Sequence, residues 1–378
     1  MAEPLKHLLD AAVVRTAAAH LHGHDRSFDA DGFVAEATRG LTKLALKARA
    51  MQIADALAHH LPADFDAAAA LIETALAPLP ADDEDFEMAR LAEAGLAGWI
   101  LWPVGEFVAR RGIDEPQRAL RVLRALTQRF TAEFAIRPLI AAHPALVFAT
   151  LARWAGDPSA RVRRLVSEGS RPRLPWGLRL KALVADPSPT LPLLRALQDD
   201  ADENVRRSVA NHLNDIAKDH PALLVEWLET HLPGAGPARR ALLKHASRTL
   251  ITQGEPRVLA AFGLGARFRG EAALALTPAR IALGEAVTLA LTLRSTARSA
   301  QTLHIDYAVH HVKAHGGTTP KVFKGWHLTL APREARVLTR RHAVRPITTR
   351  VYYAGLHRVV VQINGQAVAE AAFNLRVP

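Results

Sequence analysis

The chain has 378 residues, of which 49% are hydrophobic, so it can form globular domains, and two domains are the default expectation. It contains no cysteine, which excludes disulfides, thiolate zinc sites and a cysteine nucleophile. No run of eighteen apolar residues occurs without a charge, and residues 1–20 lack the layout of a signal peptide. We therefore expect a soluble cytoplasmic protein that does not cross a membrane.

Positive charge is concentrated toward the C-terminus. Residues 1–110 carry 9 Lys and Arg against 17 Asp and Glu, residues 111–266 carry 23 against 15, and residues 267–378 carry 16 against 5. The net charge of +11 therefore comes from the middle and last parts of the chain, as expected of a polyanion-binding surface. A solubility device, or a preference for Arg over Lys in a GC-rich genome, is the alternative explanation.

Helical periodicity extends from the start of the chain to about Leu264. Alanine and leucine are abundant, and apolar residues recur at spacings of three and four, as at Leu41, Leu44, Ala45 and Ala48. Turn signals built on Gly, Pro and Asp interrupt this periodicity. The pattern predicts helices joined by tight turns.

An internal repeat lies within the helical part. Residues 157–169 read DPSARVRRLVSEG and residues 200–212 read DADENVRRSVANH, so the Val-Arg-Arg cores at Val162 and Val205 lie 43 residues apart. A weaker copy at Ala238 follows 33 residues later. Such spacings are typical of paired-helix solenoids, and we predict an α-solenoid of HEAT-like helical repeats in a domain of residues 1–266.

Alignment of the copies separates a buried row from a polar row. In the second copy, Val205, Val209, Leu213 and Ile216 form the buried row. Stacked helices would align the polar rows into one basic surface with a few carboxylates, on a concave face that suits a duplex. The polar row comprises Arg207, Asn211, Asp215 and Lys218, with Arg164 and Glu168 in the first copy and Arg240, Lys244 and Arg248 in the third.

The hydrophobic period changes to two near residue 266. Apolar residues alternate with other residues from Val287 to Leu293, and Asn364-Gly365 is a strong hairpin signal. About seven short strands fit into the remaining sequence. A second domain, residues 267–378, is therefore expected to be a basic immunoglobulin-like β-sandwich that contacts DNA.

A long basic loop between strands is expected from His310 to Phe323. His310, His311 and His315 could suggest a metal site, but their spacing fits no strong zinc pattern and few carboxylates support it. A loop that faces DNA is the preferred interpretation, and neither a metal nor a cofactor is expected. The candidate DNA contacts in and beside this loop are Lys313, Lys321 and Lys324.

Three stretches combine acids and bases unusually: TAEFAIRP (residues 131–138), SEGSRPRLPW (167–176) and SVANHLNDIAKDHP (208–221). Together they resemble the AlkC branch of the HEAT-like alkylpurine DNA glycosylases, over roughly Trp99 to Ala260. The resemblance implies base excision repair of cationic lesions, chiefly 3-methyladenine and 3-methylcytosine, without a base-flipping pocket. It also implies, for some members, an immunoglobulin-like C-terminal domain. By motif, it assigns catalytic carboxylates to Glu133, Glu168 and Asp215, and the aromatic group that meets the lesion to Trp176.

These residue types suit the implied chemistry. A base methylated at N3 is cationic, and its departure leaves an oxocarbenium-like sugar, so carboxylates stabilise both. An indole face adds about 1–2 kcal/mol of cation–π attraction when it is desolvated. With water as the nucleophile no lysine Schiff base is needed, which implies a monofunctional glycosylase that leaves the strand intact.

Each candidate also has a purely structural interpretation. Glu133 could pair with Arg137 at i+4 on a solvated helix. Glu168 could be a surface charge at a helix end, and Asp215 could be a partner for Lys218. Trp176 could be a residue that only packs a loop. The alternative function is a non-catalytic HEAT-repeat scaffold that binds nucleic acid or a protein.

Basic residues near the motifs are the candidate DNA contacts. Arg171 and Arg173 alternate with Pro172 and are close to Trp176 in sequence, so they are candidates for phosphate contact. Structural ion pairs are the alternative for every one of these side chains. The expected partner is double-stranded DNA that contains methylated bases. We expect the chain to bind it as a monomer, and we expect no membrane partner. The repeat faces add Arg164, Arg207, Asn211, Lys244 and Arg248.

Overall fold

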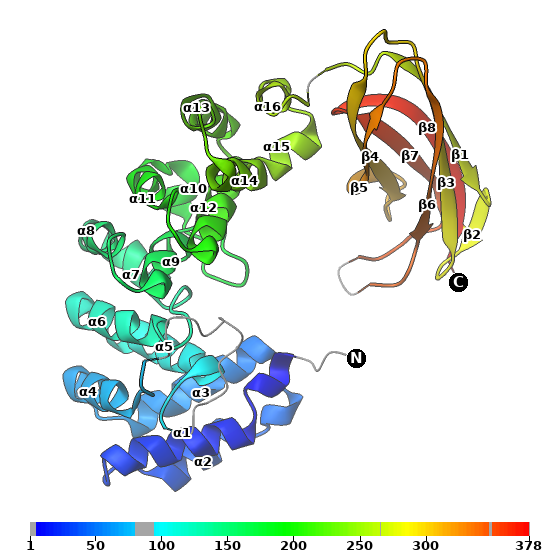
Figure 1. The fold of residues 1–378 in the computed structure, drawn as a ribbon. Coiled ribbons are helices and arrows are strands. Elements are labelled where there is room, and N and C mark those ends of the chain that lie inside the picture. Colours follow the sequence, from blue (N-terminus) through cyan, green and yellow to red (C-terminus); the bar gives the residue numbers. More distant parts are fainter. Residues whose placement is uncertain (1–4, 80–93, 265, 348–349, 378) are drawn as a thin grey trace. The chain divides into compact units, whose positions relative to one another are not determined.

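A computed structural model describes residues 5–79, 94–264, 266–347 and 350–377. Within these ranges the chain forms sixteen α-helices followed by eight β-strands (Figure 1). The predicted α-solenoid followed by an immunoglobulin-like β-sandwich is confirmed. No helix among the described residues is long and apolar enough to cross a membrane.

The chain divides into two compact units, Met1–Asp219 and His220–Pro378. The change from helix to strand falls between Ala261 and Gly270, beside the predicted domain boundary at residues 266 and 267. The second compact unit begins earlier, because it includes the last four helices together with the sandwich.

The first unit contains α1 to α12, and its helix starts follow from local sequence. Asp10, Asp29, Asp64 and Asp202 each accept backbone N–H groups at the start of a helix, which satisfies donors that lack a partner within the helix. The helices are α1 (Ala11–His24), α2 (Ala30–Thr38), α3 (Leu46–His60), α4 (Phe65–Ala75), α5 (Leu101–Arg111), α6 (Pro116–Thr127), α7 (Ile136–Ala142), α8 (Pro144–Trp154), α9 (Ala160–Gly169), α10 (Lys181–Ala185), α11 (Leu191–Leu197) and α12 (Glu203–Ile216).

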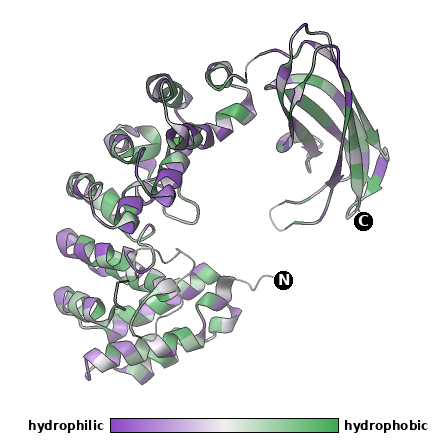
Figure 2. Ribbon diagram, viewed as in Figure 1, coloured by the Kyte–Doolittle hydropathy of each residue, from purple (hydrophilic) through white to green (hydrophobic). Residues whose placement is uncertain are grey.

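Helices of this unit stack in two layers, with α4, α6, α8 and α11 in one layer and α3, α5, α9 and α12 in the other (Figure 1). The predicted buried row of α12 is confirmed, since Val205, Val209, Leu213 and Ile216 are all buried. Hydrophobic and hydrophilic residues take opposite sides of many helices (Figure 2). The apolar row of each helix is therefore covered by its neighbours.

The two good copies of the sequence repeat have matching structures. Each copy begins with an aspartate that accepts a hydrogen bond from an arginine of an earlier helix. Arg124 Nε of α6 donates to Asp157 at 2.8 Å, and Arg163 Nε of α9 donates to Asp200 at 2.6 Å. In both copies the first arginine after the valine also donates to two backbone carbonyls at the start of its own repeat, from Arg163 and from Arg206. The repeat therefore encodes ion pairs that link each repeat to the next.

The second unit consists of four helices and a sandwich of two sheets. One sheet has the strand order β1-β3-β6, and the other has the order β2-β8-β7-β4-β5. The elements are α13 (Pro221–His231), α14 (Pro237–Ala246), α15 (Arg248–Gln253), α16 (Pro256–Ala261), β1 (Gly270–Thr277), β2 (Arg280–Ala282), β3 (Ala286–Ser295), β4 (Gln301–Val312), β5 (Thr318–Leu330), β6 (Ala335–Ala343), β7 (Gly355–Ile363) and β8 (Gln366–Arg376).

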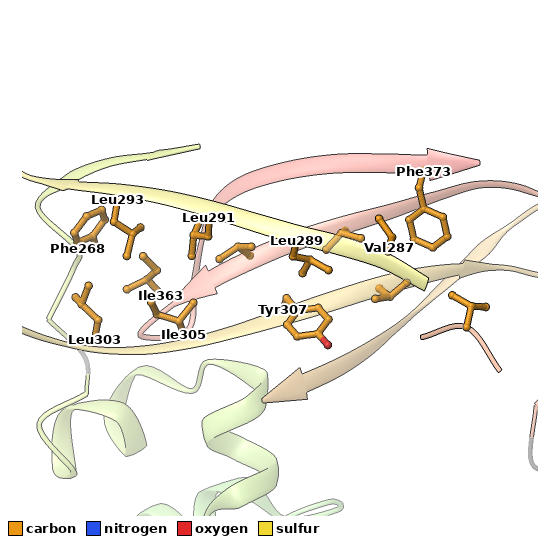
Figure 3. Close-up of a cluster of buried hydrophobic side chains, with 14 of the residues drawn as sticks. Phe268, Val287, Leu289, Leu291, Leu293, Leu303, Ile305, Tyr307, Ile363 and Phe373 are labelled. Atoms are coloured by element: carbon orange, nitrogen blue, oxygen red, sulfur yellow. The ribbon is translucent and has the colours of Figure 1, made fainter. Parts of the chain in front are cut away.

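The core of the sandwich lies between its two sheets. Leu289 and Leu291 of β3 face Ile305 and Tyr307 of β4 and Ile363 of β7 (Figure 3). The predicted alternation in β3 is confirmed, because Val287, Leu289, Leu291 and Leu293 are fully buried while the residues between them are exposed or half-buried.

The predicted hairpin at Asn364-Gly365 is also confirmed. Both residues have positive φ, +51° and +80°, as a type I′ turn requires, and they join β7 to β8. Gly254, after α15, lies against this turn: a Cβ added there would come within 2.9 Å of the Gly365 carbonyl oxygen. The last helices and the sandwich therefore belong to one compact unit.

The predicted long loop from His310 to Phe323 is wrong. Most of this segment is β-strand, with β4 ending at Val312, β5 beginning at Thr318 and only five residues between them. Pro320 lies within β5, which is possible because β5 is an edge strand and needs no N–H donor on its outer side. Pro320 is therefore compatible with an edge strand, and Gly316 and Gly317 lie in the tight turn that precedes it.

Candidate active site

Two repeat helices bring Glu168 and Asp215 together around one arginine. Glu168 lies in the last turn of α9, and Asp215 lies in the last turn of α12. Arg171 Nη1 donates to Glu168 Oε1 at 2.6 Å, and Arg171 Nε donates to Asp215 Oδ2 at 2.8 Å. Glu168, Arg171 and Asp215 are 6%, 7% and 1% exposed. The interpretation of Glu168 as a solvated charge at a helix end is therefore wrong.

Each of these carboxylates has a second polar partner. Ser208 Oγ donates to Glu168 Oε2 at 2.6 Å, and Lys218 Nζ donates to Asp215 Oδ1 at 2.7 Å. Burial acts to raise the pKa of Glu168, but the charges of Arg164 and Arg171 and the Ser208 hydrogen bond outweigh it and hold the pKa below its ordinary value. Glu168 is therefore ionised at neutral pH.

Glu133 lies in a turn that precedes α7, and not on a solvated helix. Its Oε2 accepts from Arg164 Nη1 at 3.0 Å and from Thr131 Oγ1 at 2.8 Å. Arg137, the expected i+4 partner, is fully buried and donates to backbone carbonyls instead. The interpretation of Glu133 as half of a helix-surface pair is therefore wrong. Arg164 acts on both Glu133 and Glu168.

The cations that match these carboxylates differ in accessibility. The side chain of Arg171 is 8% exposed, whereas those of Arg164 and Lys218 are 21% and 41% exposed. An anion that approaches from solvent can compete for Arg164 and Lys218 but not for Arg171. Such competition would leave Glu133 and Asp215 with more of their negative charge uncompensated.

Trp176 lies in a strained turn between α9 and α10. Gly177 N donates to Leu174 O at 3.3 Å, which closes a β-turn with Pro175 in its second position and Trp176 in its third. The φ of Trp176 is +64°, in the left-handed region that glycine fills most easily. A bulky residue in this conformation costs about 1–3 kcal/mol, so the surrounding structure must hold it.

The indole of Trp176 is only partly covered. It is 59% exposed, and it stacks on Trp102 with ring centroids 6.5 Å apart and planes 5° from parallel. Trp102 is buried and also contacts Phe134, at a centroid distance of 5.0 Å. Lys47 Nζ donates to the Trp176 carbonyl at 3.2 Å. Loop packing does not account for this side chain, because more than half of it remains open to a flat ligand.

The predicted outward-facing polar row is correct only in part. Arg207 on α12 and Lys218 just after it are exposed, but Asp215 on the same row is buried, and so is Glu168 on α9. The reason is that Arg171, in the segment after α9, turns back between the two helices and binds both carboxylates. Helical periodicity contains no information about this segment.

Comparisons with known proteins agree with this architecture. A family model described as the C-terminal Ig-like domain of the uncharacterised protein YhaZ matches residues 271–377. YhaZ of Bacillus subtilis is 39% identical over 277 residues, which span 72% of this chain and 75% of YhaZ. The Pseudomonas fluorescens alkylpurine DNA glycosylase AlkC, bound to DNA containing an abasic site analog, has a TM-score of 0.88 and 34% identity over 99% of this chain and 100% of that chain. The chain belongs to the AlkC family.

In this AlkC-family chain, several predicted DNA contacts of the first unit form ion pairs. Arg173 donates twice to Asp219, both times at 2.6 Å, and Arg207 pairs with Glu203 at 2.6 Å with both side chains mostly exposed. Arg171 and Arg164 belong to the carboxylate cluster described above. Asn211 is half-buried on α12. Contacts of Arg164, Arg173, Arg207 and Asn211 with DNA stay predictions, whereas burial argues against a phosphate contact of Arg171.

The other predicted DNA contacts lie in the second unit of the AlkC-family chain. Lys244 is exposed on α14, and Arg248 begins α15, where its guanidinium donates to the His245 carbonyl. Lys313 lies in the turn between β4 and β5, and Lys321 and Lys324 are exposed on β5. These assignments also stay predictions.

Sequence reasoning missed the groups that support the candidate site. Arg171 was assigned to a phosphate, but it bridges two carboxylates, one of them 44 positions away. Ser208 and Trp102 were not singled out, although each touches a candidate residue. Ser208 is the first residue of the motif at residues 208–221, so that motif contained a signal for it. Nothing in the local sequence links Trp102 to Trp176.

Two other features of the described residues bear on the site. An apolar cavity of about 720 Å³ lies between α7, α8 and α10, but neither the three carboxylates nor Trp176 line it. No three His, Asp or Glu side chains within the described ranges are grouped so that they could hold a metal ion.

Proposed function

We propose that this chain is a monofunctional DNA glycosylase that excises cationic N3-methylated bases, 3-methyladenine and 3-methylcytosine, from duplex DNA. The observation that carries the proposal is the set of three carboxylates, Glu133, Glu168 and Asp215, in one unit with an exposed indole in a strained turn. The relationship to AlkC, a glycosylase whose structure holds DNA, supports it.

Binding of a duplex would change the charge balance of the cluster. Phosphates compete for the accessible cations Arg164 and Lys218, and they cannot reach the buried Arg171. Glu133 and Asp215 then face the lesion with less compensation. A negative field that is fixed before the reaction stabilises the charge that develops on the sugar, without reorganisation.

Ionised carboxylates suit this leaving group. A cationic N3-methylated base departs as a neutral molecule when the N-glycosidic bond between the base and C1′ breaks. No general acid therefore has to protonate the base. A water oxygen forms the new bond to C1′, and one carboxylate accepts the proton that this water loses. Glu168 is ionised at neutral pH because its pKa is depressed, so it can stabilise the cationic sugar throughout.

Trp176 would meet the cationic base on its open face. The other face is occupied by Trp102, so a flat cation can stack on one side only. The indole lies at the tip of a surface turn, and an aromatic group at such a tip reaches a lesion without a pocket to receive a flipped base. This geometry supports excision without base flipping.

The decisive experiment is base release by the purified full-length chain from methylated duplex DNA in the presence of a chelator. We expect free 3-methyladenine or 3-methylcytosine and an abasic site that breaks only on treatment with alkali. We expect negligible release of the neutral bases uracil and 8-oxoguanine, because a carboxylate cluster stabilises a cationic leaving group selectively. Absence of any released methylated base, or efficient removal of a neutral base, would contradict the proposal.

A non-catalytic DNA-binding scaffold is the competing function. The specific observation in its favour is that all three carboxylates form ion pairs with arginine or lysine side chains. A scaffold would bind methylated and unmethylated duplexes equally and would release no base. The release assay therefore separates the two functions.

A further inference from the structure

Arg137 is a fully buried arginine directly beneath the turn that carries Trp176. It lies in the first turn of α7, with 0% of its surface exposed. Burial, together with the charge of Arg171, lowers its pKa to about 10, so the guanidinium stays protonated at neutral pH. A charged side chain in such a place requires polar partners close by.

The partners of Arg137 are the two ends of the segment between α9 and α10. Nη1 donates to the Gly169 carbonyl at 2.8 Å, at the end of α9, and Nε donates to the Leu178 carbonyl at 2.5 Å, just after the turn. One rigid guanidinium therefore ties residue 169 to residue 178. Because its donors are held in one plane, it fixes the distance between the two ends as well as their direction.

The turn that carries Trp176 also packs closely on the Arg137 side chain. A Cβ added to Gly177 would lie 3.2 Å from Arg137 Cδ and Nε and 3.1 Å from Leu174 Cδ2. These contacts are tighter than ordinary van der Waals contact, so the turn rests directly on the arginine. The strained φ of Trp176 is thus held from below by Arg137 and at its own carbonyl by Lys47.

We propose that Arg137 is a positioning residue for base excision, which holds the strained turn so that the open face of Trp176 is presented to the lesion. The inference rests on the proposed glycosylase function, but its structural half can be tested without it. Arg137 does not touch the lesion in this scheme and acts only through the turn.

The test is a double-mutant cycle between Arg137→Met and Trp176→Ala, with excision of 3-methyladenine as the first readout. We expect Arg137→Met alone to reduce the excision rate at least about 30-fold, since displacement of a positioned group by about 1 Å can cost a hundredfold. In the Trp176→Ala background the same change should cost less than about threefold, because its target is already absent. Arg137→Lys, which keeps the charge but cannot reach both carbonyls with planar donors, should lie between.

The second readout is the near-ultraviolet circular dichroism of the stacked indoles Trp102 and Trp176. The difference between the spectra of wild type and Trp176→Ala reports this stacked pair. We expect the spectra of Arg137→Met and of the double variant Arg137→Met, Trp176→Ala to show no such difference. Arg118→Met is the matched control, because the Arg118 side chain is also largely buried, at 11% exposed, and its partners Asp66 and Glu73 lie on α4 and not at the Trp176 turn. Arg118→Met should leave both readouts unchanged.

The outcomes separate the two proposals. If the rate losses of Arg137→Met and Trp176→Ala multiply, or if the indole signal survives in Arg137→Met, the positioning role is overturned. If the wild-type chain releases no base, the glycosylase function is overturned, and the circular dichroism cycle still decides whether Arg137 holds the turn. If Arg137→Met does not fold, Arg137→Lys is taken through the same cycle, where equal losses with and without Trp176 overturn the role.

Discussion

Arg171 determines how Glu168 and Asp215 can act. The removal of a buried carboxylate would leave part of this guanidinium without a partner, so a substitution here affects folding as well as chemistry. Ser208 and Lys218 hold the second oxygens of the two carboxylates. Amide substitutions are therefore preferable to alanine, because they keep the shape and one acceptor oxygen while they remove the charge.

Neutral variants of the three carboxylates should lose catalysis but keep DNA binding. For Glu133→Gln, Glu168→Gln and Asp215→Asn we expect excision to fall about tenfold to a thousandfold, which corresponds to about 1.4–4 kcal/mol. Duplex affinity should stay the same or rise slightly, since a negative charge near phosphates is removed. Single-turnover excision and duplex binding, measured on each variant, check this.

The control for these variants is Asp219→Asn. Asp219 also pairs with an arginine, Arg173, but at a partly exposed position outside the buried cluster. Its loss should change excision less than about threefold, as expected for an exposed pair. Full activity of all three carboxylate variants would show that the cluster is structural.

At the scale of elements, successive repeats are joined by ion pairs between a helix of one repeat and the aspartate that begins the next. Arg163 of α9 forms two hydrogen bonds with Asp200, at 2.6 and 2.9 Å, and the side chains are 18% and 6% exposed. Burial acts to raise the pKa of Asp200, but the hydrogen bonds from Arg163 and from the Asp202 backbone, together with the charges of Arg163 and Arg206, outweigh it and hold the pKa below its ordinary value. This pair therefore stabilises the fold at neutral pH, and its contribution is lost as the pH falls through the depressed pKa.

Asp200→Asn should destabilise the first unit by about 2 kcal/mol, because a partly buried arginine loses its charged partner. The exposed pair of Arg207 and Glu203 is the internal comparison, and Glu203→Gln should cost less than about 0.5 kcal/mol. Chemical denaturation of both variants at pH 7 measures the difference. Equal costs would show that the ion pair between repeats contributes nothing beyond a surface pair.

The sandwich should be sensitive to acid through buried histidines. Burial lowers the pKa of His311 on β4 to about 3 and that of His342 on β6 to about 4, so both are neutral in the folded chain. In the unfolded chain they take up protons below about pH 6.5, so their stabilising effect is complete above that pH and is lost as the pH falls toward 4. We expect a loss of about 2 kcal/mol for each histidine at pH 5.

His311→Leu is the variant that tests this dependence. Both ring nitrogens of His311 are buried without a hydrogen-bond partner, so the substitution removes the titration without loss of a hydrogen bond. The difference in melting temperature between pH 7.5 and pH 5 should be smaller in this variant than in wild type. His315→Leu, at an exposed turn position, should leave the difference unchanged.

At the scale of the whole molecule, the most basic part of the chain contains no candidate catalytic residue. Residues 267–378 carry 16 Lys and Arg against 5 Asp and Glu, and the three carboxylates all lie before residue 220. If the sandwich contacts phosphates, its charges should govern affinity and salt dependence without any role in the chemical step.

Neutralisation of Lys313, Lys321 and Lys324 to Gln should flatten the dependence of log affinity on log salt by up to about 2.7, since each phosphate contact contributes about 0.9. Excision from saturated complexes should not change. Arg358→Gln is the control, because Arg358 already pairs with Glu370 on the neighbouring strand. An unchanged slope in the triple variant would make the sandwich a solubility or protein-docking module.

The sequence by itself determined the features that depend on neighbours along the chain. Hydrophobic periods of three to four and of two distinguish the solenoid from the sandwich, the Asp and Val-Arg-Arg spacing predicts the repeat, and Asn364-Gly365 predicts the hairpin. These features are local, so a few dihedral preferences and one buried face suffice to specify them. Motif resemblance added the identities of the candidate site residues.

Only the tertiary structure decided how the site is built. Arg171, a candidate phosphate contact, lies buried between two carboxylates. Arg137, considered only as a surface partner of Glu133, lies beneath the Trp176 turn, and most of residues 310–323 form strands and not a loop. In each case the deciding partner is distant in sequence or belongs to a neighbouring strand. The conformation of a long side chain or an edge strand depends on which groups the fold brings within hydrogen-bonding distance, and local preferences carry no record of those groups.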